Sequence, residues 1–115
     1  TSTLGAACDE AGLQLLPGVA TASEVLLAYG DGRRFVKFFP AVAAGGVPVL
    51  KALAGPFPDV RFCPTGGITE ATAPEFLALP GVPVCGGTWL TPPALVAGRE
   101  WATITELARR AAALG

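Results

Sequence analysis

A strand, a loop and a helix follow one another in residues 35–54, FVKFFPAVAAGGVPVLKALA. The stretch opens with an apolar run that ends at a proline and is interrupted by one charge, Lys37. Short apolar runs bounded by proline or glycine are typical of strands buried in parallel sheets. A diglycine loop follows at 45–46, Pro48 opens a helix, and a Gly-Pro pair at 55–56 ends it. This stretch therefore predicts one βα unit.

Further helices are predicted before and after this unit. Leu4–Ala11 is rich in alanine and is followed by Gly12, which favours a helix that ends there. Thr21 and Glu24 have the spacing of a capping box, which predicts a helix that continues through Tyr29. A final helix is predicted from apolar residues spaced by three, at Trp101, Ile104 and Leu107.

Four apolar runs are predicted to be strands, and each leads into a helical stretch. They are Leu13–Val19, Phe35–Pro40, Val60–Pro64 and Val82–Cys85. Strands that alternate with helices predict right-handed βαβ units and a parallel sheet, so the fold class is α/β. Units averaging under ~30 residues favour a (β/α)8 TIM barrel over an open sheet. Four strands make half of such a barrel, so we expect residues 1–115 to form one partial TIM-barrel domain.

Composition limits the function. Hydrophobic residues make up 51% of the 115 residues and the net charge is -1, which argues against disorder and against nucleic-acid binding. Three cysteines without paired spacing suggest neither a disulfide framework nor a zinc site, which fits a reducing cytoplasm. No apolar run approaches the ~20 residues of a membrane span. With no starting Met and no signal peptide, we expect a chain that begins within its fold.

Lys37 places an ammonium in an otherwise apolar strand, and burial of an unpaired charge is costly. Alternation puts Phe35, Lys37 and Phe39 on one face, so in a barrel Lys37 and Phe39 would share the interior. Removal from water favours the neutral amine, which is the form that attacks a carbonyl carbon. The alternative is a lysine on an edge strand whose ammonium reaches solvent.

Two diglycine loops each come directly after a predicted strand and before a helical stretch. They are Pro-Thr-Gly-Gly-Ile at 64–68 and Cys-Gly-Gly-Thr-Trp at 85–89. Paired glycines let successive backbone N–H groups face an anion, and a following helix start adds positive dipole. In barrels, the loops after strands seven and eight often bind phosphate. Either loop alone could be a tight βα turn, but two in succession favour a shared phosphate site.

Absent residue types also discriminate between mechanisms. The chain has no histidine, so metal-dependent catalysis and histidine-based triads lack obvious ligands or a base, and we expect no metal site. The acidic residues fall in predicted helices or turns away from Lys37, so a general base is missing. Cys63 and Cys85 are expected to be small core residues, and Arg33 and Arg34 to be solvated.

Taken together, these motifs resemble the 2-keto-3-deoxy-6-phosphogluconate (KDPG) aldolase family. The resemblance covers essentially the whole chain and implies a C-terminal half of a TIM barrel, with strands five to eight. The strings similar to strands five and six are PGVAT at 17–21, followed by Ser23-Glu24, and KFFPA at 37–41. Those similar to the strand-seven and strand-eight signatures are GPFP at 55–58, VRFCPTGGI at 60–68, LALP at 77–80 and GGTWL at 86–90.

The resemblance implies a class I aldolase, a carbon–carbon lyase that cleaves KDPG to pyruvate and glyceraldehyde 3-phosphate in the Entner–Doudoroff pathway. Some relatives also cleave 4-hydroxy-2-oxoglutarate. Lys37 would attack the keto carbon, and the protonated imine would accept electrons as the carbon–carbon bond breaks. No metal or organic cofactor would be needed. The full-length protein would be a cytoplasmic homotrimer.

The resemblance also assigns roles to single residues. Thr65 would lie near the bound carboxylate or imine, and Phe39 would pack against the apolar edge of the substrate. The phosphate would be held by Gly66, Gly67, Gly86, Gly87 and Thr88. Val42 stands where many members carry Glu, and Thr88 replaces the usual serine while keeping the hydroxyl. The first half of the barrel, with the family's Glu base and a substrate-binding Arg, is absent from this sequence.

Two other functions fit the same residues. A half barrel could be a non-catalytic phosphate-binding or self-associating domain, in which two copies cover each other's exposed strand edges. The same lysine chemistry could also serve an aldolase for a related 2-keto-3-deoxy acid. In every case we expect small-molecule ligands, with pyruvate and a phosphorylated keto acid first, and neither nucleic acid nor membrane.

Overall fold

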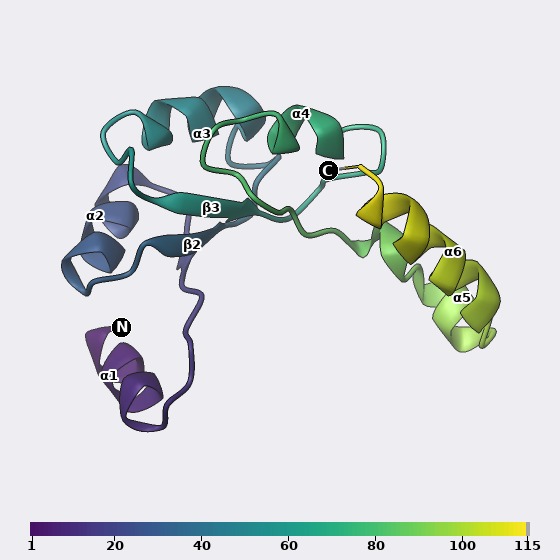
Figure 1. Ribbon diagram of the computed structural model, residues 1–115, viewed down its shortest axis with the longest axis horizontal. Coiled ribbons are helices and arrows are strands. Elements are labelled where there is room, and N and C mark those ends of the chain that lie inside the picture. The colour runs from purple at the N-terminus through teal and green to yellow at the C-terminus, as the bar shows by residue number, and fades with distance from the viewer. Residues whose placement is uncertain (115) are drawn as a thin grey trace.

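A parallel sheet of three strands, in the order β1-β2-β3, lies at the centre of the fold. Figure 1 labels the two longer strands, β2 and β3. The computed structural model describes residues 1–114. The strands are β1, Gly18–Val19; β2, Phe35–Phe38; and β3, Arg61–Pro64. Lys37 of β2 pairs with Gly18 on one side and with Cys63 on the other. The predicted α/β class with parallel strands is confirmed.

The connections between strands are helical, as predicted. The Thr21 side chain accepts a hydrogen bond from the N–H of Glu24, and the Glu24 carboxylate accepts one from the N–H of Thr21. The capping box predicted from the sequence is therefore confirmed. The helical elements are α1, Ser2–Glu10; α2, Ala22–Gly30; α3, Gly46–Ala54; α4, Ala73–Leu77; the 3-10 helix η1, Thr88–Leu90; α5, Pro93–Ala97; and α6, Trp101–Ala112.

One face of the sheet carries the hydrophobic core. Val36, Phe38 and Phe62 are fully buried on this face. They form one cluster with apolar side chains of α2, α3 and α4, and Figure 1 shows α3 and α4 together on one side of β2 and β3. Full burial of a side chain of this size contributes roughly 1.5–3 kcal/mol. The core thus fixes the orientation of both longer strands.

The other face of the sheet, which we call the open face, carries Phe35, Lys37 and Phe39. Phe35 is 40% exposed and Phe39 is 50% exposed, while Lys37 is half-buried. The neighbouring residues Val36 and Phe38 are buried on the core face. The alternation predicted for this strand is confirmed, because side chains of successive strand residues point to opposite faces.

The first predicted strand, Leu13–Val19, is mostly wrong, since pairing is limited to β1. Contact with β2 begins at Pro17, whose carbonyl oxygen accepts a hydrogen bond of 2.8 Å from the N–H of Lys37. Leu13 and Leu16 are 62% and 40% exposed. An apolar run becomes a strand only where a neighbour supplies hydrogen bonds. Among residues 1–114 no strand lies beside residues 13–16.

The fourth predicted strand, Val82–Cys85, is also wrong. The segment runs beside β3, where Phe62 donates its N–H to Gly81 at 2.8 Å and Gly86 donates its N–H to Pro64 at 2.9 Å. Between these two hydrogen bonds, Pro64 and Pro83 have no N–H to donate. The contact is therefore reduced to a single parallel bridge between Thr65 and Gly86.

The chain ends in a helical hairpin of α5 and α6, which lies to one side of the sheet in Figure 1. Helix α6 contains Trp101, Ile104 and Leu107, as predicted from their spacing. None of its residues is fully buried, and Trp101 is 57% exposed. In the described part of the chain, no helix has the length and apolar character needed to cross a bilayer.

Candidate active site

Lys37 lies in the middle of the sheet on its open face. It belongs to β2, the central strand, and its lateral neighbours are Gly18, which has no side chain, and Cys63, which has a small one. Its Nζ is 4.9 Å from the centre of the Phe39 ring. An ammonium within about 6 Å of an aromatic ring is attracted to the ring face. The edge-strand alternative is wrong, because β2 is paired on both sides.

Phe39 follows the end of β2 and packs against the diglycine loop at 64–68. A Cβ added at Gly66 would lie 3.1 Å from two carbons of the Phe39 ring and 3.2 Å from the Cα of Pro40. Gly66 also has a φ of +104°, which side chains rarely adopt. Only glycine therefore lets the backbone pass this close to the Phe39 ring, which also lies near the Lys37 ammonium.

Thr65 follows β3 and forms two backbone hydrogen bonds to the segment at the end of β2. Its N–H donates to the carbonyl oxygen of Phe38 at 2.9 Å, and its own carbonyl oxygen accepts from the N–H of Ala41 at 2.8 Å. Its Oγ1 lies 3.5 Å from the carbonyl oxygen of Cys63 and 3.8 Å from the Cys63 Sγ. Thr65 comes two residues after Cys63, and side chains two residues apart along a strand point to the same face. Thr65 therefore lies on the open face with Cys63 and Lys37.

The two diglycine loops lie beside each other. Gly86 is bridged to Thr65, and a Cβ added at Gly87 would be 3.1 Å from the carbonyl oxygen of Ile68. Gly87 also lies so close to the Trp89 ring that no Cβ would fit. The structure therefore brings the two loops together, as their succession in the sequence led us to expect.

Several backbone N–H groups in these loops remain available for a ligand. Within residues 1–114, the N–H groups of Gly66, Gly67, Gly87 and Thr88 donate no hydrogen bond to a protein acceptor. Gly66 and Gly67 both have positive φ, +104° and +75°, a backbone shape that turns successive N–H groups toward one side. The N–H of Gly86 is already used, because it donates to Pro64.

Cys63 is the residue that sequence reasoning misplaced. It is half-buried and lies in register with Lys37 on the open face, and not in the core. The same alternation that placed Lys37 could have placed it, since the neighbouring Phe62 is buried. Cys85 is half-buried as well, and burial, aided by the nearby Cys63, raises the pKa of its thiol.

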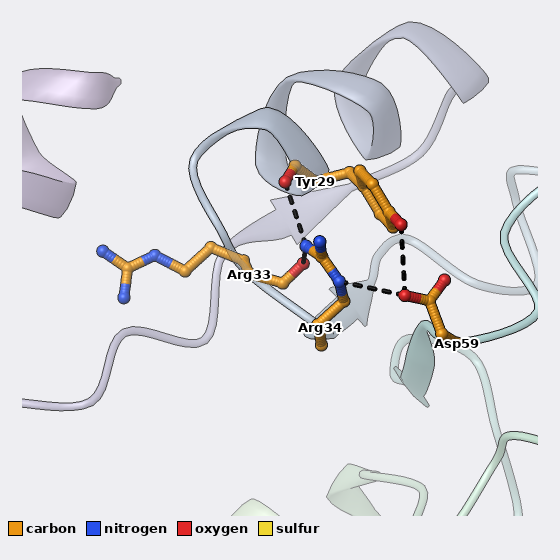
Figure 2. Close-up of polar contacts among 4 residues, drawn as sticks. All are labelled: Tyr29, Arg33, Arg34 and Asp59. Atoms are coloured by element: carbon orange, nitrogen blue, oxygen red, sulfur yellow. Dashed lines mark hydrogen bonds and ion pairs between the residues drawn. The ribbon is translucent and has the colours of Figure 1, made fainter.

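The basic residues before β2 lie at the other end of the strand, and the prediction that Arg33 is solvated is wrong. The Arg33 side chain is 17% exposed and forms a 2.7 Å ion pair with Asp9, a hydrogen bond that raises the pKa of the guanidinium. Figure 2 shows the second cluster, in which Arg34 donates to Asp59 at 3.1 Å and lies over the Tyr29 ring. These contacts join α1 and α2 to the amino ends of β2 and β3.

Several carboxylates form hydrogen bonds or ion pairs with groups other than Lys37. Glu24 caps α2, and Asp9, Asp59 and Glu70 pair with arginines. In residues 1–114 no three His, Cys, Asp or Glu side chains gather in a way that could hold a metal ion. Residues 1–114 therefore supply an amine and a hydroxyl on the open face and free N–H groups in the adjoining loops, but no carboxylate in contact with the amine.

Proteins of known structure are similar to this chain in both fold and sequence. A KDPG aldolase from Legionella pneumophila, solved with pyruvate captured as a covalent carbinolamine intermediate, is 45% identical, with a TM-score of 0.92 over 96% of this chain and 54% of that one. The 2-keto-3-deoxy-6-phosphogluconate aldolase of Zymomonas mobilis, solved with 3-phosphoglycerate, is 44% identical, with a TM-score of 0.90 over 100% of this chain and 54% of that one.

Sequence comparison agrees. The 2-dehydro-3-deoxy-phosphogluconate aldolase of Pseudomonas aeruginosa is 53% identical over 97 residues, which is 84% of this chain and 44% of that protein. The chain thus spans about half the length of the curated relatives it matches. A family model described as KDPG and KHG aldolase matches residues 1–107. With this match over nearly all of its length, the chain belongs to the family of KDPG and KHG aldolases.

Proposed function

We propose that this chain forms the C-terminal half of a (β/α)8 barrel, strands five to eight, in a class I aldolase. The enzyme would cleave KDPG to pyruvate and glyceraldehyde 3-phosphate, with 4-hydroxy-2-oxoglutarate as a further substrate. The observation that carries the proposal is the position of Lys37 on the open face, between Gly18 and Cys63 and beside Phe39. The family match and the pyruvate adduct of the Legionella pneumophila relative support it.

In the proposed reaction the Nζ of Lys37 attacks the keto carbon of the substrate, and loss of water leaves a protonated imine. The bond between the carbon next to the imine and the following hydroxyl-bearing carbon then breaks. Its electron pair moves into the imine and gives an enamine, while the hydroxyl proton leaves to a base and the aldehyde departs. Protonation of the enamine and hydrolysis release pyruvate and restore the Lys37 amine.

The remaining residues of the open face would bind the rest of the substrate. The Thr65 hydroxyl, which lies 3.5 Å from the carbonyl oxygen of Cys63, would donate to the carboxylate of the keto acid, and the exposed Phe39 ring would pack against the carbon chain. The unused N–H groups of Gly66, Gly67, Gly87 and Thr88 would hold the phosphate. Because no carboxylate in residues 1–114 contacts Lys37, we assign the general base to the other half of the barrel.

A trapping experiment tests the role of Lys37. The protein, expressed as its gene encodes it, is incubated with pyruvate and sodium borohydride, digested and examined by mass spectrometry. We expect a reduced pyruvyl adduct on Lys37 and none on Lys51, the other lysine of this sequence, which is exposed on α3. An unmodified Lys37 in folded, wild-type protein would overturn the proposal. Lys51→Ala is the matched control, and it should trap pyruvate as the wild type does.

The exposed apolar side chains favour a second candidate, self-association through the open face. Phe35 and Phe39 on that face, together with Val84, are 40–50% exposed, which leaves apolar surface without a cover in the described residues. If residues 1–115 occur as a separate protein, two copies could cover each other. Sedimentation of that chain would decide, since a monomer that unfolds cooperatively would exclude this candidate. In the barrel proposal the same surface faces the other strands, and the full-length aldolase would assemble as a trimer.

A further inference from the structure

Gly86 differs from the other glycines of the two loops. Its N–H donates to the carbonyl oxygen of Pro64 at 2.9 Å, and it forms the parallel bridge to Thr65. Its φ also lies outside the left-handed range that Gly66 and Gly67 occupy. Neither a free donor nor the shape of the backbone therefore explains why a glycine stands at this position.

The Thr65 side chain gives the explanation. A Cβ added at Gly86 would lie 2.8 Å from the Thr65 Oγ1 and 3.2 Å from its Cγ2. Ordinary contacts to a Cβ are longer than about 3.4 Å, because carbon and oxygen repel each other at shorter range. The nearest atom is the hydroxyl that the proposed function uses, so an alanine at position 86 would displace that hydroxyl first.

Thr65 can yield to a new Cβ only by rotating its side chain. Its backbone is fixed by hydrogen bonds with Phe38, the last residue of β2, and with Ala41 in the loop that follows. A β-branched side chain has few staggered positions, and leaving one of them moves the hydroxyl by a full rotamer step. The hydroxyl would then leave its place beside the carbonyl oxygen and Sγ of Cys63, which lies in register with Lys37.

We propose that Gly86 is a positioning residue that acts through Thr65. By leaving out a side chain, it keeps the Thr65 hydroxyl on the open face, at the level where the carboxylate of a keto acid bound to Lys37 would lie. This inference rests on the proposed function, because it assumes that the hydroxyl contacts the substrate. It separates Gly86 from Gly66, Gly67 and Gly87, whose N–H groups are free for the phosphate.

A double-mutant cycle in the protein as its gene encodes it tests the inference. The variants are Gly86→Ala, Thr65→Ala and both together, and the readouts are kcat and KM for KDPG cleavage and the rate of borohydride trapping with pyruvate. We expect each single variant to lower kcat/KM by roughly 10–100-fold, the range for loss of one hydrogen bond to a charged group such as a carboxylate. The double variant should be no slower than Thr65→Ala, because the added Cβ then has no side chain to displace.

Inhibition by inorganic phosphate shows whether Gly86 positions the Thr65 hydroxyl or binds the phosphate itself. Inorganic phosphate should inhibit wild type and Gly86→Ala with the same inhibition constant, since the Gly86 N–H is not free. Multiplicative losses in the double variant would overturn the inference, as would a tenfold weaker inhibition by phosphate in Gly86→Ala. Borohydride trapping of pyruvate on Lys37 in the wild type tests the proposed function separately. Failure of the proposed function can therefore be distinguished from failure of the inference about Gly86.

Folding of the variants is checked by thermal unfolding. If Gly86→Ala fails to fold while Gly86→Ala/Thr65→Ala folds, the conflict lies with the Thr65 side chain, as inferred. If both fail to fold, position 86 needs a glycine for another reason and the inference is wrong.

Discussion

Lys37 and Cys63 are paired directly across the ladder between β2 and β3, with both side chains on the open face. On the other side of Lys37 lies Gly18, so the lysine has space on both flanks. A nucleophilic amine must admit a substrate carbon to within about 3–3.5 Å along a defined direction. The small neighbours leave that approach open, and the core behind β2 keeps the strand that carries the lysine in place.

Filling the space next to Lys37 should slow adduct formation. Cys63→Leu adds a branched side chain in register with the lysine, and we expect the rate of borohydride trapping with pyruvate to fall by at least about tenfold. Arg61→Leu is the matched control, because it lies on the same strand and face but pairs with Phe35. Equal rates in the two leucine variants would show that the space beside Lys37 is not used.

Two neighbouring phenylalanines should respond in opposite ways to substitution. Phe38 is fully buried in the core, and Phe38→Ala should lower the free energy of unfolding by about 3–5 kcal/mol. Phe39 is 50% exposed, and Phe39→Ala should change that free energy by less than about 1 kcal/mol while raising KM. Urea unfolding and steady-state kinetics on both variants check the pair. Similar losses of stability would contradict the assignment of the two faces.

The sequence predicts the faces of the strands better than their lengths. Val36 and Phe38 on one side and Lys37 on the other follow from alternation, and the capping box of Thr21 and Glu24 follows from local hydrogen bonds. Strand pairing is not local. Residues 13–16 have the apolar character of a strand but no neighbour within the described residues, so composition alone overestimated β1.

Proline explains the other failure of prediction. Val82–Cys85 is apolar enough for a strand, yet Pro83 cannot donate to β3 and Pro64 cannot donate back. The position of Cys63 was available from the sequence, through its alternation with Phe62, and was missed because a cysteine in an apolar run suggests a core residue. The role inferred for Gly86 was not available, since it depends on the contact with Thr65 across two loops.

The capping box at α2 should make stability depend on pH. Hydrogen bonds from the backbone N–H groups of Ala20 and Thr21 lower the pKa of Glu24 below its usual value of 4.5. Because the folded pKa is lowered, the stabilisation is complete above the unfolded value and is lost as the pH falls through the folded one. Glu24→Gln should therefore have a lower Tm than the wild type at neutral pH, and the difference should shrink below that folded pKa.

A matched variant for this test is Glu10→Gln, at the end of α1, where Glu10 makes no hydrogen bond through its side chain in the described residues. It removes one negative charge from the surface without touching a cap. Its Tm should follow the wild type across the same pH range. If Glu10→Gln and Glu24→Gln shift alike, the effect would be one of net charge and not of the capping box.

Arg33 should hold α1 against the rest of the chain. In residues 1–114, it donates the side-chain hydrogen bonds that reach α1 from outside the helix, two to Asp9 and one to the carbonyl oxygen of Gly5. Arg33→Met keeps most of the apolar stem but removes the donors, so residues 11–17 should become more accessible to proteases, with cleavage at least about threefold faster when local opening limits it.

Arg34→Met, which loses the contacts to Asp59 and Tyr29, is the control and should leave this segment protected. Arg33 precedes β2 and Thr65 follows β3, so the two residues lie at opposite ends of the parallel sheet. The kcat should therefore be unchanged in both variants, and a loss of kcat in Arg33→Met would show that α1 reaches the active site.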